Sequence, residues 1–147
     1  MDMVIRRAKA EDLAKLISFL GQAKVGTNGV EETIDCFLLI ENELEEIMAT
    51  IGIEPLGQAG LIRSLVMTSQ ATEQDFHLLF EQIIMLAKEK GIKDLFLATN
   101  KVGAVKLIEQ MGFQMVDKKQ LPELLFQSEH VLHILTVDNS VFLKLSV

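Results

Sequence analysis

An acidic and a basic side chain on neighbouring apolar runs are the residues of this sequence best placed to do chemistry. Glu54 follows the apolar run 47–53 and precedes Pro55, and Arg63 lies in the next apolar run, 61–67. A carboxylate at Glu54 could act as a general base that accepts a proton from a ligand. Arg63 could pair with the carboxylate of a ligand. Structural roles stay open for both: a solvated acid at a strand end or a partner of Arg63, and an internal salt bridge.

Metal and disulfide chemistry find little support in the sequence. Cys36 is the single cysteine, so no intrachain disulfide can form, and its apolar neighbours predict a buried side chain. The three histidines, His77, His130 and His133, are too scattered along the chain to predict a metal site. We therefore expect no bound metal.

The composition is that of one globular domain. The chain has 147 residues, of which 49% are hydrophobic and 24% charged, and this is enough to bury a sizeable core. Its formal net charge of -7 disfavours nucleic acid and anionic membranes as partners, because both need clustered Lys and Arg. The sequence shows no signal-peptide pattern and no apolar run of membrane-spanning length, so a cytoplasmic protein is expected.

Apolar periodicity divides the chain into strands and helices. The longest helix should begin at Thr72, because Thr72 and Asp75 have the spacing of a capping box. Apolar residues then recur at helical spacing from Phe76 until Gly91 ends the helix. The other expected helices follow Glu11, lie around 31–34 and 104–111, and open at Pro122; the expected strands are 3–8, 36–40, 47–53, 61–67, 94–98, 113–116 and 141–147.

The order of these elements predicts the fold class. Antiparallel strands come first and β-α-β units follow, with 36–40 and 47–53 forming a hairpin around the acidic run 41–46, expected to be a solvated turn. Such an order is typical of a mixed, mostly antiparallel sheet flanked by helices, in the α/β (α+β) class. The absence of repeats and linkers predicts a single domain over 1–147.

Three segments, taken in order, resemble the GNAT N-acetyltransferase superfamily. The run 61–67 is similar to that family's fourth strand, whose exposed backbone receives acyl-CoA, and the helix from Thr72 is similar to its pyrophosphate-binding helix. The segment 101–113, ending in Gly112-Phe113, resembles its late helix-to-strand signature. The resemblance spans nearly the whole chain and implies a single-domain GNAT fold.

Shorter matches resemble the amino-acid N-acetyltransferase branch that includes members from arsenic-resistance operons. They are Ile53-Glu54-Pro55, Arg63-Ser64-Leu65, Leu121-Pro122, Ser128-Glu129 and 140–145. The resemblance implies Glu54 as catalytic base, and Arg63 and Ser64 as contacts to the acceptor substrate. Contacts to acetyl-CoA or another acyl-CoA are implied for Leu65, Val66, Met67, Ala71, Thr72, Glu73, Gln74, Asp75, Phe76, Asn100 and Ala104.

The sequence departs from the family where the long helix begins. The family's loop there carries two small positions, usually glycines, that let backbone N–H groups approach a pyrophosphate. Here residues 71–76 read Ala-Thr-Glu-Gln-Asp-Phe, without glycine and with carboxylates at Glu73 and Asp75 that repel an anion. The tyrosine that many members use to protonate the leaving thiolate falls at Ile108, and the chain has no tyrosine.

These observations predict two functions of different classes. The first is an acyl-CoA-dependent N-acyltransferase, an acetyltransferase acting on a small amine or amino acid, with weakened cofactor binding. The second is a catalytically inactive GNAT-fold module that senses a ligand or binds a protein. The partner expected in the first case is a small molecule, with neither nucleic acid nor membrane; a homodimer is left open.

Overall fold

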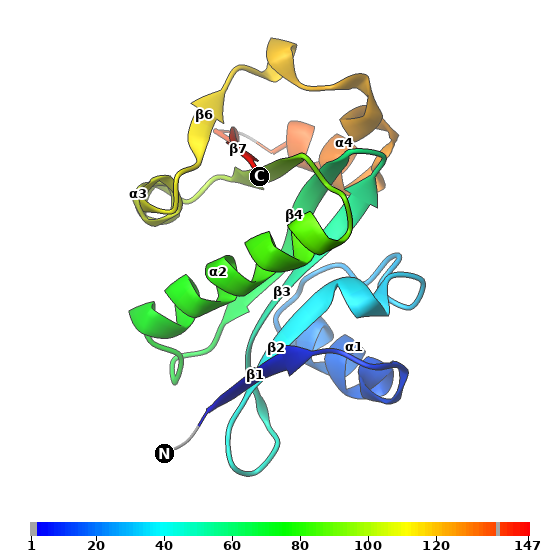
Figure 1. Cartoon of the computed structure of the whole chain (residues 1–147), viewed down its shortest axis with the longest axis vertical. Coiled ribbons are helices and arrows are strands. Elements are labelled where there is room, and N and C mark those ends of the chain that lie inside the picture. Colours follow the sequence, from blue (N-terminus) through cyan, green and yellow to red (C-terminus); the bar gives the residue numbers. More distant parts are fainter. Residues whose placement is uncertain (1–2, 138) are drawn as a thin grey trace. The chain divides into compact units, whose positions relative to one another are not determined.

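The computed structural model describes residues 3–137 and 139–147 (Figure 1). The elements follow one another in the order that the apolar pattern predicts. The strands are β1 Val4–Arg7, β2 Phe37–Glu41, β3 Ile47–Leu56, β4 Ala59–Met67, β5 Asp94–Thr99, β6 Gln114–Val116 and β7 Val141–Ser146. The α-helices are α1 Leu13–Gln22, α2 Glu73–Glu89, α3 Val102–Gln110 and α4 Glu129–Leu135. None of the helices in the described ranges is long and apolar enough to cross a membrane.

The strands hydrogen-bond in the order β1-β2-β3-β4-β5-β7-β6. Strand β2 pairs antiparallel with β1 and β3, and β7 pairs antiparallel with β5 and β6, whereas β4 and β5 are parallel. The predicted mixed, mostly antiparallel sheet and the predicted hairpin of β2 and β3 are therefore confirmed. The register of β4 with β5 runs from Ala59 opposite Asp94 to Leu61 opposite Phe96.

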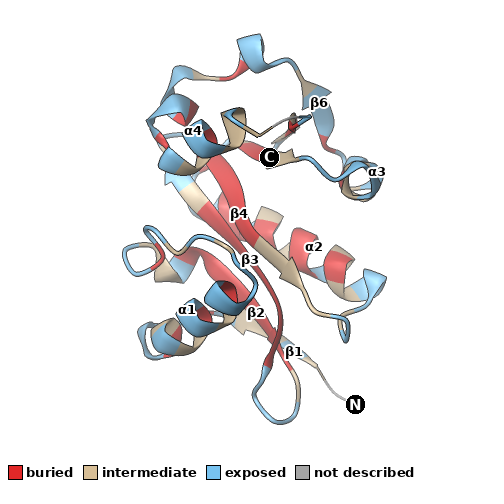
Figure 2. Cartoon of the chain, turned by 180° about the vertical axis from the view of Figure 1, so that it is seen from behind, coloured by how far each residue is buried: buried red, intermediate tan, exposed pale blue. Residues whose placement is uncertain are grey.

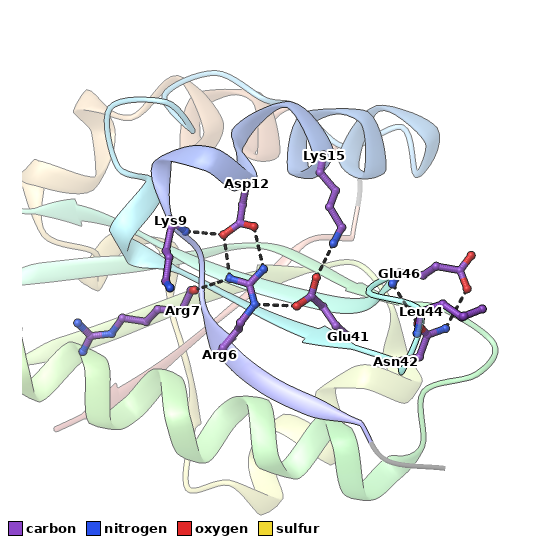
Figure 3. A network of polar contacts seen from close by, with 9 residues as sticks. All are labelled: Arg6, Arg7, Lys9, Asp12, Lys15, Glu41, Asn42, Leu44 and Glu46. Carbon is purple, nitrogen blue, oxygen red and sulfur yellow. Dashed lines mark hydrogen bonds and ion pairs between the residues drawn. The ribbon is translucent and has the colours of Figure 1, made fainter.

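The chain forms two compact units, of which the first spans the residues up to Glu54 and Arg63–Leu86. In this unit α1 and α2 cover opposite faces of strands β1 and β2 (Figure 3). Helix α1 has an apolar stripe because Leu16 and Leu20 are one turn apart, and both are fully buried against Phe37 and Leu39 of β2. In Figure 2 the outer side of α1 is exposed and its inner side is buried.

Four charged side chains join β1, β2 and α1 in this first unit (Figure 3). Arg6 of β1 donates two hydrogen bonds to the Asp12 carboxylate, at 2.8 and 2.7 Å, and its Nε–H donates to Glu41 at 2.7 Å. Lys15 of α1 donates to the second oxygen of Glu41. The expectation that the acidic run 41–46 is a solvated turn is therefore wrong for Glu41, which ends β2 and is 7% exposed.

The second unit spans Pro55–Ile62 and Ala87–Val147. Its core joins Ala59 and Leu61 of β4, Phe96 of β5 and Phe142 of β7 to the apolar side of the segment before β7. That segment contributes Leu121, Leu125 and Val131. Strand β5 is the centre of this unit because it pairs with β4 along one edge and with β7 along the other.

Three boundaries of helices and strands differ from those predicted from local sequence patterns. Pro122 does not open an α-helix: it precedes a 3-10 segment, Glu123–Gln127, and α4 begins only after Ser128, whose Oγ accepts the N–H of Val131 at 3.2 Å. The helix expected around 31–34 is a turn followed by a 3-10 segment, Ile34–Cys36, so β2 starts one residue later than expected. Pro55 lies inside β3 near its end, where a missing N–H donor is tolerated.

Candidate active site

Strand β4 leaves the regular extended conformation at Ser64. This residue has φ of +55°, in the left-handed region that a non-glycine residue rarely adopts. Its carbonyl accepts a hydrogen bond from Oγ1 of Thr50 at 2.8 Å, and Thr50 is fully buried. The conformation interrupts the two-residue alternation of side chains along β4. Backbone strain of this kind is concentrated at functional sites.

Arg63 is a buried residue, 7% exposed, that contacts the segment after α1. One terminal nitrogen of its guanidinium donates to the carbonyl of Asn28, and the other donates to the carbonyl of Gly26 at 3.1 Å. The guanidinium carbon also lies 5.9 Å from the ring centroid of Phe37, within cation–π range. Arg63 therefore fixes the segment 26–28 through backbone carbonyls, a structural role different from the internal salt bridge that the sequence analysis left open.

Two buried polar atoms at this point have no hydrogen-bond partner. They are Nε of Arg63 and Oγ of Ser64, which belong to consecutive residues. A buried donor without a partner costs about 1–3 kcal/mol. Both residues were predicted to contact the acceptor substrate, and the structure brings their unsatisfied atoms into the same stretch of β4.

Glu54 shares the electrostatic environment of Arg63. Burial lowers the pKa of the Arg63 guanidinium, and the negative charge of Glu54 opposes that shift. Glu54 lies within β3 and is half-buried. The two candidate residues of the opening hypothesis thus lie within one unit and influence each other, as expected if they act on the same ligand or as an ion pair.

Four of the six backbone N–H groups from Ala71 to Phe76 are used inside the protein. The N–H of Thr72 donates to the Asp75 carboxylate at 2.8 Å, and the N–H of Asp75 donates to Oγ1 of Thr72 at 3.1 Å. The N–H of Phe76 donates to the carbonyl of Thr72, and that of Ala71 donates to the carbonyl of Thr68, both at 3.1 Å. The predicted capping box is confirmed, so α2 satisfies the start of its own backbone.

The first turn of α2 is also anchored and acidic. Phe76 is 7% exposed, and its ring lies 4.8 Å from that of Phe80, so Phe76 anchors this turn in the core. Glu73 is exposed, and its carboxylate lies 3.9 Å from Nε2 of His77. The remaining first-turn N–H groups, those of Glu73 and Gln74, are flanked by two carboxylates, of Glu73 and Asp75.

Two of the predicted acyl-CoA contacts, Asn100 and Ala104, lie in the second unit. Asn100 is exposed after β5, and the N-cap position of α3 is taken by Lys101, whose N–H donates to Oγ1 of Thr99 at 3.1 Å. Ala104 is partly buried in α3, and Ile108 is 1% exposed, which confirms that Ile108 is a core residue. The ligand roles of Asn100 and Ala104 stay predictions.

The residues that support Arg63 and Ser64 from neighbouring strands were not predicted from the sequence. Thr50 supports the backbone at Ser64, and Phe37 lies against the guanidinium of Arg63. Gly52 is opposite Phe37 in the register of β2 and β3, and a Cβ on Gly52 would lie 2.5 Å from the Phe37 ring. A glycine inside an apolar strand is the signal that could have identified this close approach. Within the described ranges no group of His, Cys, Asp and Glu side chains could hold a metal.

Comparison with known proteins identifies one relative and a common fold. The chain is 30% identical over 141 residues to the uncharacterized protein YwlB of Bacillus subtilis, covering 95% of each protein. No protein-family profile matches it. Rv2747 from Mycobacterium tuberculosis, solved in complex with CoA, has a TM-score of 0.77 at 15% identity, covering 98% of this chain and 99% of Rv2747.

Two further solved structures name the fold. N-acetylglutamate synthase from Neisseria gonorrhoeae, complexed with coenzyme A and N-acetyl-glutamate, has a TM-score of 0.74 at 22% identity, covering 99% of this chain and 35% of that one. An acetyltransferase of the GNAT family from Staphylococcus aureus has a TM-score of 0.69 at 17% identity, covering 99% of both chains. Identities this low establish the fold alone. The chain therefore belongs to the same family as YwlB and has the fold of the GNAT acetyltransferases.

Proposed function

We propose that this protein is an acyl-CoA-dependent N-acyltransferase, an acetyltransferase that acts on a small amine or, preferably, an amino acid. The observation that carries the proposal is a buried Arg63, with an unsatisfied Nε–H and within the electrostatic influence of Glu54, on a fold shared with CoA-bound proteins. A zwitterionic amino acid presents an ammonium and a carboxylate, and these two residues supply one charge of each sign to meet them. N-acetylglutamate synthase, which shares the fold, was complexed with an N-acetylated amino acid.

The acceptor carboxylate is proposed to bind at Arg63 and Ser64. The Nε–H of Arg63 and the hydroxyl of Ser64 have no hydrogen-bond partner among the residues that the structure describes, so they are donors for a ligand that gains access to them. The terminal nitrogens of Arg63 already hold the carbonyls of Gly26 and Asn28. A bound carboxylate would therefore share the guanidinium with the segment 26–28 or displace it.

Glu54 is proposed to be the general base. It accepts a proton from the acceptor ammonium, directly or through a water molecule, and leaves a neutral amine. The amine nitrogen attacks the thioester carbonyl carbon, a C–N bond forms as the C–S bond breaks, and the nitrogen releases one further proton to water to become the amide. Because the chain has no tyrosine, water protonates the departing thiolate.

The donor is proposed to lie along the second half of β4. The acyl-CoA supplies an activated acyl group as a thioester. The backbone of Leu65, Val66 and Met67 would hold its acyl and pantetheine part. The residues at the start of α2 fit the pyrophosphate poorly, because their N–H groups are used internally. We therefore expect CoA to bind with a Kd in the high-micromolar to millimolar range, about -4 to -6 kcal/mol.

Replacement of the proposed base tests the chemistry. Glu54→Gln should lower kcat by about 10²- to 10⁴-fold and leave the melting temperature nearly unchanged, because the side chain is only half-buried. Glu81→Gln makes the same charge change on an exposed position of α2 and should leave turnover unchanged. Full activity in Glu54→Gln would remove this residue from the mechanism.

Replacement of Arg63 distinguishes a role in substrate binding from a role in stabilising the fold. Arg63→Lys keeps the positive charge but loses the planar fork, so we expect the KM for the amino acid to rise by about tenfold or more. The KM for the acyl donor should change little. Equal changes in both KM values together with a large drop in melting temperature would support a purely structural role for Arg63.

An inactive, ligand-sensing module is the second candidate. The internally capped start of α2 and the occupied fork of Arg63 favour it, because both use potential ligand-binding groups within the protein. The two candidates differ in one result. Binding of an amino acid without any formation of N-acetylated product in the presence of acetyl-CoA would support the sensor and reject the enzyme.

A further inference from the structure

The start of α2 would be expected to bind the nucleotide part of CoA, because helix N-termini offer unpaired N–H groups and positive potential to phosphates. In this protein the N–H groups of Thr72 and Asp75 are engaged in the reciprocal capping box, at 2.8 and 3.1 Å. The N–H groups of Ala71 and Phe76 donate to the backbone carbonyls of Thr68 and Thr72. Two N–H groups out of six are thus left, which is too few to surround a pyrophosphate.

Side chains of the same stretch do not replace these missing donors. From Thr68, directly after β4, to Ala87 in the last turns of α2, the sequence contains no lysine and no arginine. His77 is the one basic side chain of this stretch, and it lies 3.9 Å from the carboxylate of Glu73. Glu73 and Asp75 add two negative charges at the same helix end, where they already complement the helix dipole.

We propose that the acyl donor is recognised through its acyl group and pantetheine arm and that its nucleotide contributes little to binding. This inference rests on the proposed N-acyltransferase function. It follows that simple acyl-pantetheine thioesters should serve as donors about as well as acyl-CoA. The bond changes are the same with either donor: the amine forms the C–N bond, the C–S bond breaks, and free pantetheine thiol is released in place of CoA.

The expected selectivity between CoA and pantetheine can be given as a ratio of their Kd values. Each charge-assisted hydrogen bond that the pyrophosphate gained would favour CoA over pantetheine by about tenfold or more. With the cap intact and the carboxylates in place, we expect Kd values for CoA and for pantetheine that agree within about threefold. The agreement should hold at high salt, where repulsion of the phosphates by the carboxylates of Glu73 and Asp75 is screened; at low salt this repulsion should make CoA bind more weakly than pantetheine, never more tightly.

The primary experiment compares four ligands on the full chain. Binding of CoA and of reduced pantetheine is measured by calorimetry, and kcat/KM is measured with acetyl-CoA and with acetyl-pantetheine at a fixed amino-acid concentration. Values that agree within about threefold support the inference. A CoA affinity about thirtyfold or more above that of pantetheine overturns it while leaving the N-acyltransferase function intact. Binding of neither ligand rejects the proposed function itself.

Two variants test whether the start of α2 is the cause. Glu73→Gln with Asp75→Asn removes the charges and keeps an acceptor at position 75, so CoA binding should tighten by about five- to thirtyfold at low salt and lose this gain at high salt. Thr72→Ala with Asp75→Ala also frees two N–H groups, and CoA should then be preferred over pantetheine by about tenfold. Circular dichroism checks that α2 persists in both double variants.

A matched control removes one charge from the same helix away from its start. Glu81→Ala lies two turns along α2 on an exposed position, and it should not change the ratio of the CoA and pantetheine Kd values. Pantetheine affinity should be constant across all of these variants. A ratio that shifts equally in Glu81→Ala, or that stays constant in both double variants, would show that the capping box does not set donor selectivity.

Discussion

The ion-pair network of β1, β2 and α1 predicts a specific loss of stability in acid. Asp12 accepts two hydrogen bonds from Arg6 and one from the N–H of Lys9 at 2.7 Å, and its side chain is 9% exposed (Figure 3). The hydrogen bonds from Arg6 are the main reason that the pKa of Asp12 falls from 3.8 to about 2. Glu41 shows the same direction: burial pushes its pKa up, but hydrogen bonds from Arg6 and Lys15 outweigh burial and lower it.

The size of the effect follows from the shift of Asp12. Each pKa unit corresponds to about 1.4 kcal/mol, so the depressed pKa contributes about 2 kcal/mol to the free energy of unfolding. The sign follows from proton binding. Above pH 4 the carboxylate is ionised in both states and the full contribution is present. Between about pH 4 and pH 2 the unfolded chain binds the proton first, and the contribution disappears.

The test is the variant Asp12→Asn, whose free energy of unfolding is measured by urea unfolding between pH 7 and pH 2.5 and compared with that of the wild type. The variant should be at least about 2 kcal/mol less stable than the wild type at pH 7, and this difference should shrink as the pH falls below 4. Near pH 7 the melting temperature should drop by about 4–8 °C or more. Glu11→Gln, at the exposed neighbouring position, is the control for charge and should cost little. A difference between Asp12→Asn and wild type that is constant with pH would refute the reasoning.

Three further substitutions, at two glycine positions and one helix cap, can be checked by thermal unfolding. Gly52→Ala places a Cβ 2.5 Å from the buried ring of Phe37, so it should lower the free energy of unfolding by about 1–3 kcal/mol or more. It should also disturb Arg63, which lies over that ring. Gly21→Ala in α1, where a Cβ meets nothing within 4 Å, should instead stabilise the protein by up to about 1 kcal/mol. Ser128→Ala removes the N-cap oxygen of α4 and should cost about 0.5–2 kcal/mol, and unchanged stability would mean that the cap is dispensable.

Features with a local cause were predictable from the sequence. The start of α2 is an example, because Thr72 and Asp75 are three residues apart and satisfy each other regardless of the rest of the fold. The mixed sheet was predictable for a similar reason, since the apolar runs and their order are local, and the resemblance to GNAT proteins added the fold. Ile108 could be assigned to the core from helical spacing alone.

Features with a non-local cause were not predictable. Arg63 contacts the carbonyls of residues 35 and 37 positions earlier in the chain, so its structural role depends on where the segment after α1 lies. Glu41 is buried because Arg6 and Lys15 reach it from other elements. The left-handed backbone conformation of Ser64 is held by a hydrogen bond from Thr50. A serine gives no sequence signal of this conformation, whereas a glycine would have done so.

The most direct test of the central claim is product formation by the wild-type protein. Purified protein is incubated with acetyl-CoA and either an amino acid or the amine left by its decarboxylation, and the N-acetylated product is quantified by mass spectrometry. We predict an N-acetylated amino acid, formed at least about tenfold faster than the acetylated amine, because the carboxylate binds at Arg63. Formation of no acetylated product from any member of a broad panel of amino acids and amines would contradict the account.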